Sequence, residues 1–147
     1  MTRTRVYSII IILVLSGLGC DSKPKANYGR LKLINAGGTI TFDGQPLADA
    51  IVSFDDPEDD TFAYGKTDSS GRFRLQIDSE MNGVKPGAKV VRISTSRKIL
   101  GLNTDDDSDT KSATATERIP EKYNKKSRLF VEVVPSKANY DFDLKSN

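Results

Sequence analysis

Residues 67–77 read TDSSGRFRLQI, a short polar turn followed by the most regular alternation of apolar and polar side chains in the chain. The apolar set is Phe73, Leu75 and Ile77, and the polar set is Arg72, Arg74 and Gln76. A period of two places successive side chains on opposite faces, so it predicts a β-strand with one face buried and one in water. Asp68 is able to accept hydrogen bonds from the following backbone and Gly71 tolerates a left-handed conformation, so residues 68–71 are predicted to form a hairpin loop.

The same signature continues toward the N-terminus. Residues 39–42 (TITF) alternate, and the Asp43-Gly44 dipeptide that follows suits the positive φ angles of a tight hairpin turn. We expect residues 50–54 to form the return strand, with Val52 and Phe54 on one face. Residues 62–67 form a further run, which the loop at 68–71 joins to the strand at 72–77.

The C-terminal half repeats the pattern. Residues 83–87 (GVKPG) form a turn before a strand over 89–95, and residues 135–139 separate two more alternating runs. The apolar members of those two runs are Leu129, Val131 and Val133, then Tyr140, Phe142 and Leu144. No stretch keeps a helical period for ten residues. The sequence therefore predicts an all-β domain over 38–147, an antiparallel β-sandwich of about seven strands.

Acidic and polar residues are concentrated in two segments between the expected strands. Residues 100–118 are rich in Asp, Ser and Thr and are predicted to form a long exposed loop. Calcium is the alternative to simple solvation there, and its candidate ligands are Asp105, Asp106, Asp107 and Asp109. Residues 57–60 (PEDD) have the same two interpretations, and a calcium loop at 68–71 lacks further acidic ligands. We expect no metal site.

The first twenty residues have the layout of a secretory signal. Arg3 and Arg5 precede an apolar run over 6–15 that is too short for a permanent membrane span, and small residues lead to Cys20, the single cysteine. Residues 15–20 (LSGLGC) resemble the lipobox of bacterial lipoproteins, which implies a signal peptide over 1–19 and lipid attachment at Cys20. The other two interpretations are a cleaved secreted protein with an incidental cysteine and an uncleaved anchor. Residues 20–37 are expected to form the lipidated cysteine and its tether.

Composition excludes several kinds of chemistry. The chain of 147 residues has no histidine, so it has no Ser-His-Asp triad, no Cys-His pair and no His-based metal site. Its 22 basic and 20 acidic residues become 20 of each once the segment with Arg3 and Arg5 is removed. A chain without excess positive charge is not expected to bind nucleic acid. We also expect no cofactor.

Three segments together resemble a known family: GTITFDGQPLADAIVSF at 38–54, AYGKTDSSGRFRL at 63–75 and GVKPG at 83–87. They are similar to the carboxypeptidase regulatory-like, or transthyretin-like, domain, an immunoglobulin-like sandwich found in many small lipoproteins of planctomycetes. Those proteins also tend to carry segments like IPEKY at 119–123 and NYDFDL at 139–144. Lys89 stands where the family often has an aromatic residue, so we expect that strand to be less buried at its start. The resemblance implies a fold and no catalytic residue.

The sequence thus favours a non-enzymatic module at the cell envelope, periplasmic or facing outward. We expect it to be held to the membrane by lipid and either to bind an envelope protein or a polysaccharide or to serve a structural role in the envelope. A transthyretin-like hydrolase of the hydroxyisourate hydrolase type is the alternative, which the absence of histidine disfavours. Exposed aromatics would favour sugar binding, because an aromatic face stacks on a sugar ring. Tyr28, Tyr64 and Tyr123 are the candidates, although Tyr64 and Tyr123 also suit core or edge positions.

Overall fold

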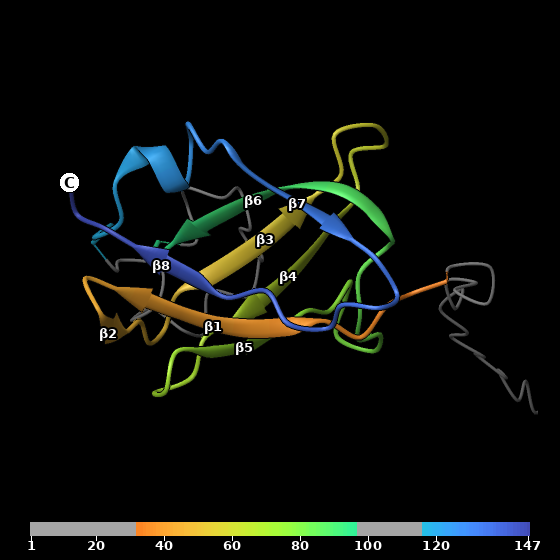
Figure 1. Cartoon of the computed structure of the whole chain (residues 1–147), viewed down its shortest axis with the longest axis horizontal. Coiled ribbons are helices and arrows are strands. Elements are labelled where there is room, and N and C mark those ends of the chain that lie inside the picture. Colours follow the sequence, from red (N-terminus) through yellow and green to blue (C-terminus); the bar gives the residue numbers. More distant parts are fainter. Residues whose placement is uncertain (1–31, 97–115) are drawn as a thin grey trace, which may run out of the picture.

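The computed structural model describes residues 32–96 and 116–147 and is built almost entirely of β-strands (Figure 1). In chain order the elements are β1 (Gly37–Phe42), β2 (Gln45–Pro46), β3 (Ile51–Asp55), β4 (Phe62–Lys66), β5 (Arg72–Arg74), β6 (Gly87–Ser94), the short 3-10 helix η3 (Glu121–Tyr123), β7 (Leu129–Val133) and β8 (Phe142–Leu144). Residues ahead of 38, the expected first residue of the domain, already contact the sandwich. Ile34 exchanges two backbone hydrogen bonds with Val84, and Ala36 is buried.

The strands form two sheets of four, which confirms the predicted all-β sandwich with eight strands instead of about seven. One sheet has the order β4-β3-β6-β7, and all of its pairs are antiparallel. In the other sheet β1 pairs antiparallel with β2 and β5, and β8 pairs parallel with β1. The parallel pair arises because the chain leaves β7 in one sheet and crosses to the other before it enters β8 (Figure 1).

The turn at Asp43-Gly44 forms as expected, with φ angles of 50° and 80° at its two central residues. Positive φ at both positions matches the twist of the flanking strands, which explains the Asp-Gly dipeptide. The expected return strand is wrong, however. Gln45–Pro46 pairs back on β1, whereas residues 51–55 form β3 at the centre of the opposite sheet. Leu47 N–H still donates to the Ile40 carbonyl of β1 at 2.9 Å, and the chain then leaves this sheet for β3.

The predicted loop at 68–71 is also present, and it joins the two sheets. Asp68 N–H donates to the Arg72 carbonyl at 2.8 Å, and Asp68 Oδ1 accepts the Ser70 N–H at 2.8 Å. The strands on either side belong to different sheets, since β4 pairs with β3 and β5 pairs with β1. Tyr64 of β4 exchanges two backbone hydrogen bonds with Gln76, which follows β5. The turn therefore forms a corner of the sandwich instead of an ordinary hairpin.

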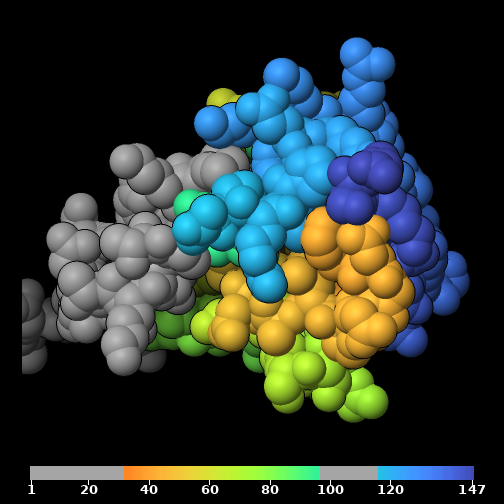
Figure 2. All heavy atoms as spheres, turned by 90° about the vertical axis from the view of Figure 1, so that its left-hand side faces the viewer, coloured from red at the N-terminus to blue at the C-terminus, as the bar shows by residue number. Residues whose placement is uncertain are grey.

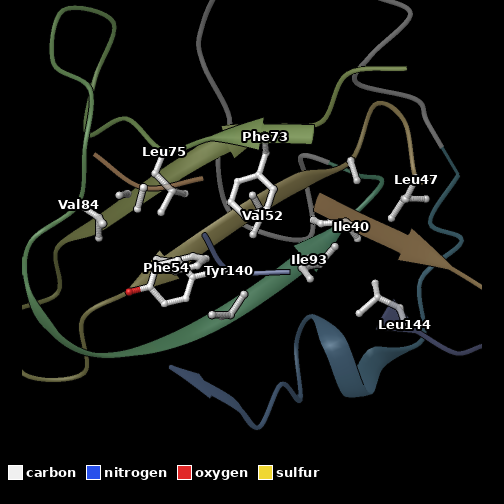
Figure 3. Packing of buried hydrophobic residues seen from close by; sticks show 14 of the residues in the cluster. Ile40, Leu47, Val52, Phe54, Phe73, Leu75, Val84, Ile93, Tyr140 and Leu144 are labelled. Atoms are coloured by element: carbon white, nitrogen blue, oxygen red, sulfur yellow. The ribbon is translucent and has the colours of Figure 1, made fainter. Parts of the chain in front are cut away.

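Alternating side chains from both sheets meet in one core (Figure 3). Phe54 lies at its centre, with ring centroids 6.3 Å from Phe73, 5.6 Å from Tyr140 and 6.2 Å from Phe142. Burial of a Phe side chain contributes about 2 kcal/mol, and edge-to-face ring contacts add to it. The predicted inward positions Phe73, Leu75, Val133, Tyr140 and Leu144 are all buried.

The C-terminal residues are fastened at one end of the sandwich (Figure 2). Figure 2 shows this end, where the β1–β2 turn, the segment around η3 and the last residues lie together. Ser146 N–H donates to Asp43 Oδ1 at 3.0 Å, and Lys145 N–H donates to the Tyr123 hydroxyl at 3.1 Å. Asp43 of the β1–β2 turn and Tyr123 of the IPEKY segment thus hold the residues that follow β8 in place.

Candidate functional site

Several residues singled out in the sequence lie outside the described part of the chain. Cys20 and Tyr28 precede it, and the four aspartates at 105, 106, 107 and 109 fall between its two ranges. The described end of the polar segment, residues 116–118, is anchored to the body. Glu117 accepts hydrogen bonds from the Ser94 hydroxyl, from Thr95 and, at 2.7 Å, from the Ile119 N–H. Burial opposes ionisation of Glu117, but these donors outweigh it and lower the pKa of its carboxyl group.

The acidic loop between β3 and β4 uses its carboxylates within the protein. Asp59 forms an ion pair with Lys85 at 2.6 Å and accepts the Thr61 hydroxyl, and these contacts lower the pKa of Asp59 to about 2. Asp56 accepts the Glu58 N–H at 3.0 Å and pairs with Lys89. Within residues 32–96 and 116–147, no three His, Cys, Asp or Glu side chains are grouped so that they could hold a metal ion.

Lys89 is buried, contrary to the expectation of an exposed strand start, with 2% of its side chain exposed. It occupies an inward position of β6 between the sheets, opposite Val131. Its ammonium group donates to Asp56 Oδ2 at 2.9 Å and to the carbonyls of Pro86 and Ala88 at 3.2 Å. The apolar stem of a lysine can fill a buried position in place of an aromatic side chain, provided that its ammonium group is paired.

This lysine borders an apolar cavity of about 230 Å³, which also contacts Phe54, Phe62, Ile77 and Val84. A lysine and a carboxylate beside a cavity are the arrangement that would support catalysis. The three donor positions of the Lys89 ammonium are all occupied by Asp56 and the carbonyls of Pro86 and Ala88, so none is left to contact a substrate. The pair therefore has the geometry of a structural clamp on the β3–β4 loop.

Two exposed aromatic rings and one half-buried ring lie on the outer face of the β4-β3-β6-β7 sheet. The outward positions that form this aromatic face are Asp55, Phe62, Tyr64, Val90, Arg92 and Phe130. Phe62, Asp55, Val90 and Phe130 are in register across the four strands. Phe62 is 41% exposed and Phe130 is 68% exposed. Because neighbouring strands are about 4.8 Å apart, the two rings lie about 14 Å apart across the sheet.

The centre of the aromatic face is polar. Arg92 forms an ion pair with Asp55 between the two rings. Burial raises the pKa of Asp55 above its usual value despite the neighbouring guanidinium. Tyr64 lies beside Phe62, with ring centroids 6.1 Å apart and an interplanar angle of 45°. Such a face is able to stack on a flat, C–H-rich ring and to exchange hydrogen bonds with hydroxyl groups around it.

Sequence reasoning identified Tyr64 but missed the two more exposed rings. The signal was present, because Phe130 alternates with the inward residues Leu129, Val131 and Val133, and Phe62 shares the outward phase of Tyr64. Tyr123, the other candidate, is half-buried and accepts a backbone hydrogen bond, so it does not belong to this face.

Comparison with family models, with curated proteins and with solved structures gives no match to this chain. In the part of the chain that the structure covers, no helix is long and apolar enough to cross a membrane.

Proposed function

We propose that this chain is a lipid-anchored envelope lipoprotein whose sandwich is a non-catalytic binding module of the carboxypeptidase regulatory-like type. We further propose that its aromatic face contacts a polysaccharide. The observation that carries this proposal is the row Phe62, Asp55, Val90 and Phe130, which combines two exposed rings with a charged pair. Single exposed apolar residues are common on protein surfaces, whereas two exposed rings in register on one sheet, with the half-buried Val90 between them, suit a binding surface.

The polysaccharide proposal predicts that the full chain sediments with an insoluble glycan. The probes are cellulose, chitin and peptidoglycan, and the test variant is Phe62→Ala combined with Phe130→Ala. Each lost stacking contact is expected to cost about 1 kcal/mol, so the double variant should bind about thirtyfold more weakly. Glu132→Ala is the matched control, because Glu132 is exposed on the same strand and face as Phe130.

Equal binding by the wild type and the double variant would overturn the role of the aromatic face. Failure of all three glycans, together with capture of an envelope protein that depends on Phe130, would favour a protein partner instead. Circular dichroism of each variant checks that the sandwich is intact.

The lipid anchor has a separate test. Mass spectrometry of the mature protein is expected to show an acylated cysteine at its N-terminus, and Cys20→Ser should move the protein from the membrane fraction to the soluble fraction. Two acyl chains suffice for stable anchoring, because each buried methylene contributes about 0.8 kcal/mol. A Cys20→Ser variant that stays in the membrane fraction would rule out lipid as the anchor.

A further inference from the structure

The outer face of the other sheet carries a groove of about 810 Å³. Its floor is the first half of β1, where Gly37 and Gly38 present no side chain. One wall comes from β5 and the end of β4, and the other comes from the segment that leads into β8. Its polar side chains include Lys66, Asp68, Arg72, Arg74, Asn139 and Asp141.

The floor depends on glycine. A Cβ atom on Gly38 would lie 2.0 Å from the Tyr140 carbonyl oxygen, and one on Gly37 would lie 2.4 Å from the Phe73 carbonyl oxygen. The backbones of both walls therefore approach β1 closely at these two residues. The groove is a product of this close approach together with the outward side chains of the walls.

The two walls differ in chemistry. Arg72 and Arg74 lie two residues apart on the outward face of β5, so their Cα atoms are about 6.8 Å apart. Among the described residues no carboxylate forms an ion pair with either guanidinium group. Lys66, in contrast, is paired with Asp49 at 2.8 Å. Within residues 32–96 and 116–147, the β5 wall thus offers two guanidinium groups without an ion-pair partner.

The opposite wall offers acceptors and an amide. Asp141 Oδ1 accepts the Thr39 N–H at 2.8 Å, which holds its carboxylate beside the floor, and Asn139 lies next to it in the lining. On the β5 side Asp68 Oδ1 accepts two N–H groups of its own turn, from Ser70 and Arg72. Both carboxylates are therefore held in fixed positions at the groove.

We propose that this groove binds an acidic sugar, with its carboxylate on Arg72 and Arg74 and its hydroxyl groups toward Asn139 and Asp141. A guanidinium fork matches a planar carboxylate with two parallel hydrogen bonds. The apolar lining residues Phe73 and Ala36 are buried, so the exposed side chains of the groove that can contact a ligand are mostly polar or charged. A phosphate dianion is less suitable than a carboxylate, because its second charge would lie near Asp68 and Asp141.

The test is a calorimetric titration of the full chain in detergent with trigalacturonate. Galactotriose, which lacks the carboxylates, and inorganic phosphate are the comparison ligands. Saturable binding of trigalacturonate is expected, with no measurable binding of the neutral trisaccharide and weaker binding of phosphate. Arg72→Gln combined with Arg74→Gln should weaken trigalacturonate binding at least about tenfold, because both guanidinium groups that would donate charged hydrogen bonds to the carboxylate are removed.

The matched control is Lys122→Gln combined with Lys125→Gln, which also removes two positive charges, but from side chains that do not line the groove. This control should bind as the wild type does, and so should the Phe62→Ala and Phe130→Ala variant, because the aromatic face lies on the other sheet. Absence of saturable binding at millimolar ligand, or equal weakening by the lysine variant, would overturn the proposal. Tighter binding of phosphate than of trigalacturonate would do the same.

Discussion

Replacing Asp56 by asparagine is expected to destabilise the protein far more than replacing Lys89 by methionine. The two side chains form one ion pair, but their environments differ, because 2% of the Lys89 side chain is exposed and 14% of the Asp56 side chain is exposed. The asparagine would keep an oxygen for the Glu58 N–H and would lose the negative charge. The Lys89 ammonium would then be a buried cation whose remaining partners are the Pro86 and Ala88 carbonyls.

The size of the effect follows from that burial. Removal of one partner from a buried ion pair costs about 3–5 kcal/mol, and we expect about 3 kcal/mol because the Asp56 side of the pair is near water. The destabilisation has an upper limit, because the buried lysine can lose its proton instead of staying charged without a partner. For an ordinary lysine that costs about 4.6 kcal/mol at pH 7, at 1.36 kcal/mol for each unit between the pH and a pKa near 10.4.

The Lys89→Met substitution is milder. The methionine side chain would occupy the space of the lysine stem, and Asp56 would remain as a carboxylate that water can reach. The loss of two hydrogen bonds to backbone carbonyls and of the ion pair is largely offset because the ammonium no longer has to be desolvated, so we expect a net cost of about 1 kcal/mol. The double variant should be close to Lys89→Met alone, because it contains no buried unpaired charge.

Urea denaturation of each full-length variant at pH 7, followed by circular dichroism, measures these differences. In thermal unfolding of a domain of this size, the same loss of about 3 kcal/mol corresponds to a fall of about 15 °C in Tm. Asp56→Asn should also regain part of its stability at higher pH, where deprotonation of the lysine requires less free energy. Equal losses from the two single variants, or a double variant less stable than Asp56→Asn, would refute the reasoning.

Three further outcomes are expected. Gly71→Ala should cost at least about 2 kcal/mol more than Gly44→Ala in the same urea assay, because both glycines have positive φ but only at Gly71 would a Cβ meet a β1 carbonyl oxygen, at 2.4 Å. Tyr140→Phe should cost about 1 kcal/mol, since the hydroxyl hydrogen-bonds two carbonyls at 3.2 Å. The pKa of Glu117 is lowered by folding, so the stability it contributes is present above pH 4.5 and is lost as the pH falls through its folded pKa. Glu117→Gln, which cannot accept the Ser94 hydroxyl in the same way, should flatten this acid dependence in unfolding curves between about pH 3 and 7.

Much of the sandwich was predictable because its signals are local. Alternation over residues 72–77 and 140–144 identified which side chains are buried, and the Asp43-Gly44 turn formed with the φ angles that its residues favour. The pairing of the strands was less predictable. Residues 50–54 were expected to return beside 39–42, yet they lie at the centre of the other sheet, because the choice of partner depends on contacts between segments far apart in the chain.

The two proposed binding surfaces were likewise predictable only in part. The outward phase of Phe62, Phe130, Arg72 and Arg74 follows from their positions in alternating runs. That Phe62 and Phe130 share one row, and that two arginines border a groove, depends on strand order and register. The prediction of lipid at Cys20 concerns a residue outside the described structure and stays a prediction, and the calcium alternative at residues 105–109 likewise lies outside the described residues.

The sequence by itself determined the fold class, the inward and outward residues of most strands, and the absence of histidine chemistry. These are properties of neighbouring residues and of composition. The tertiary structure alone decided that Lys89 is buried, that β8 runs parallel to β1, and where rings and cations gather. The physical reason is that a lysine can enter a core only where a carboxylate and carbonyls from other segments meet its ammonium group, and a surface becomes a site only where separate strands bring its residues together.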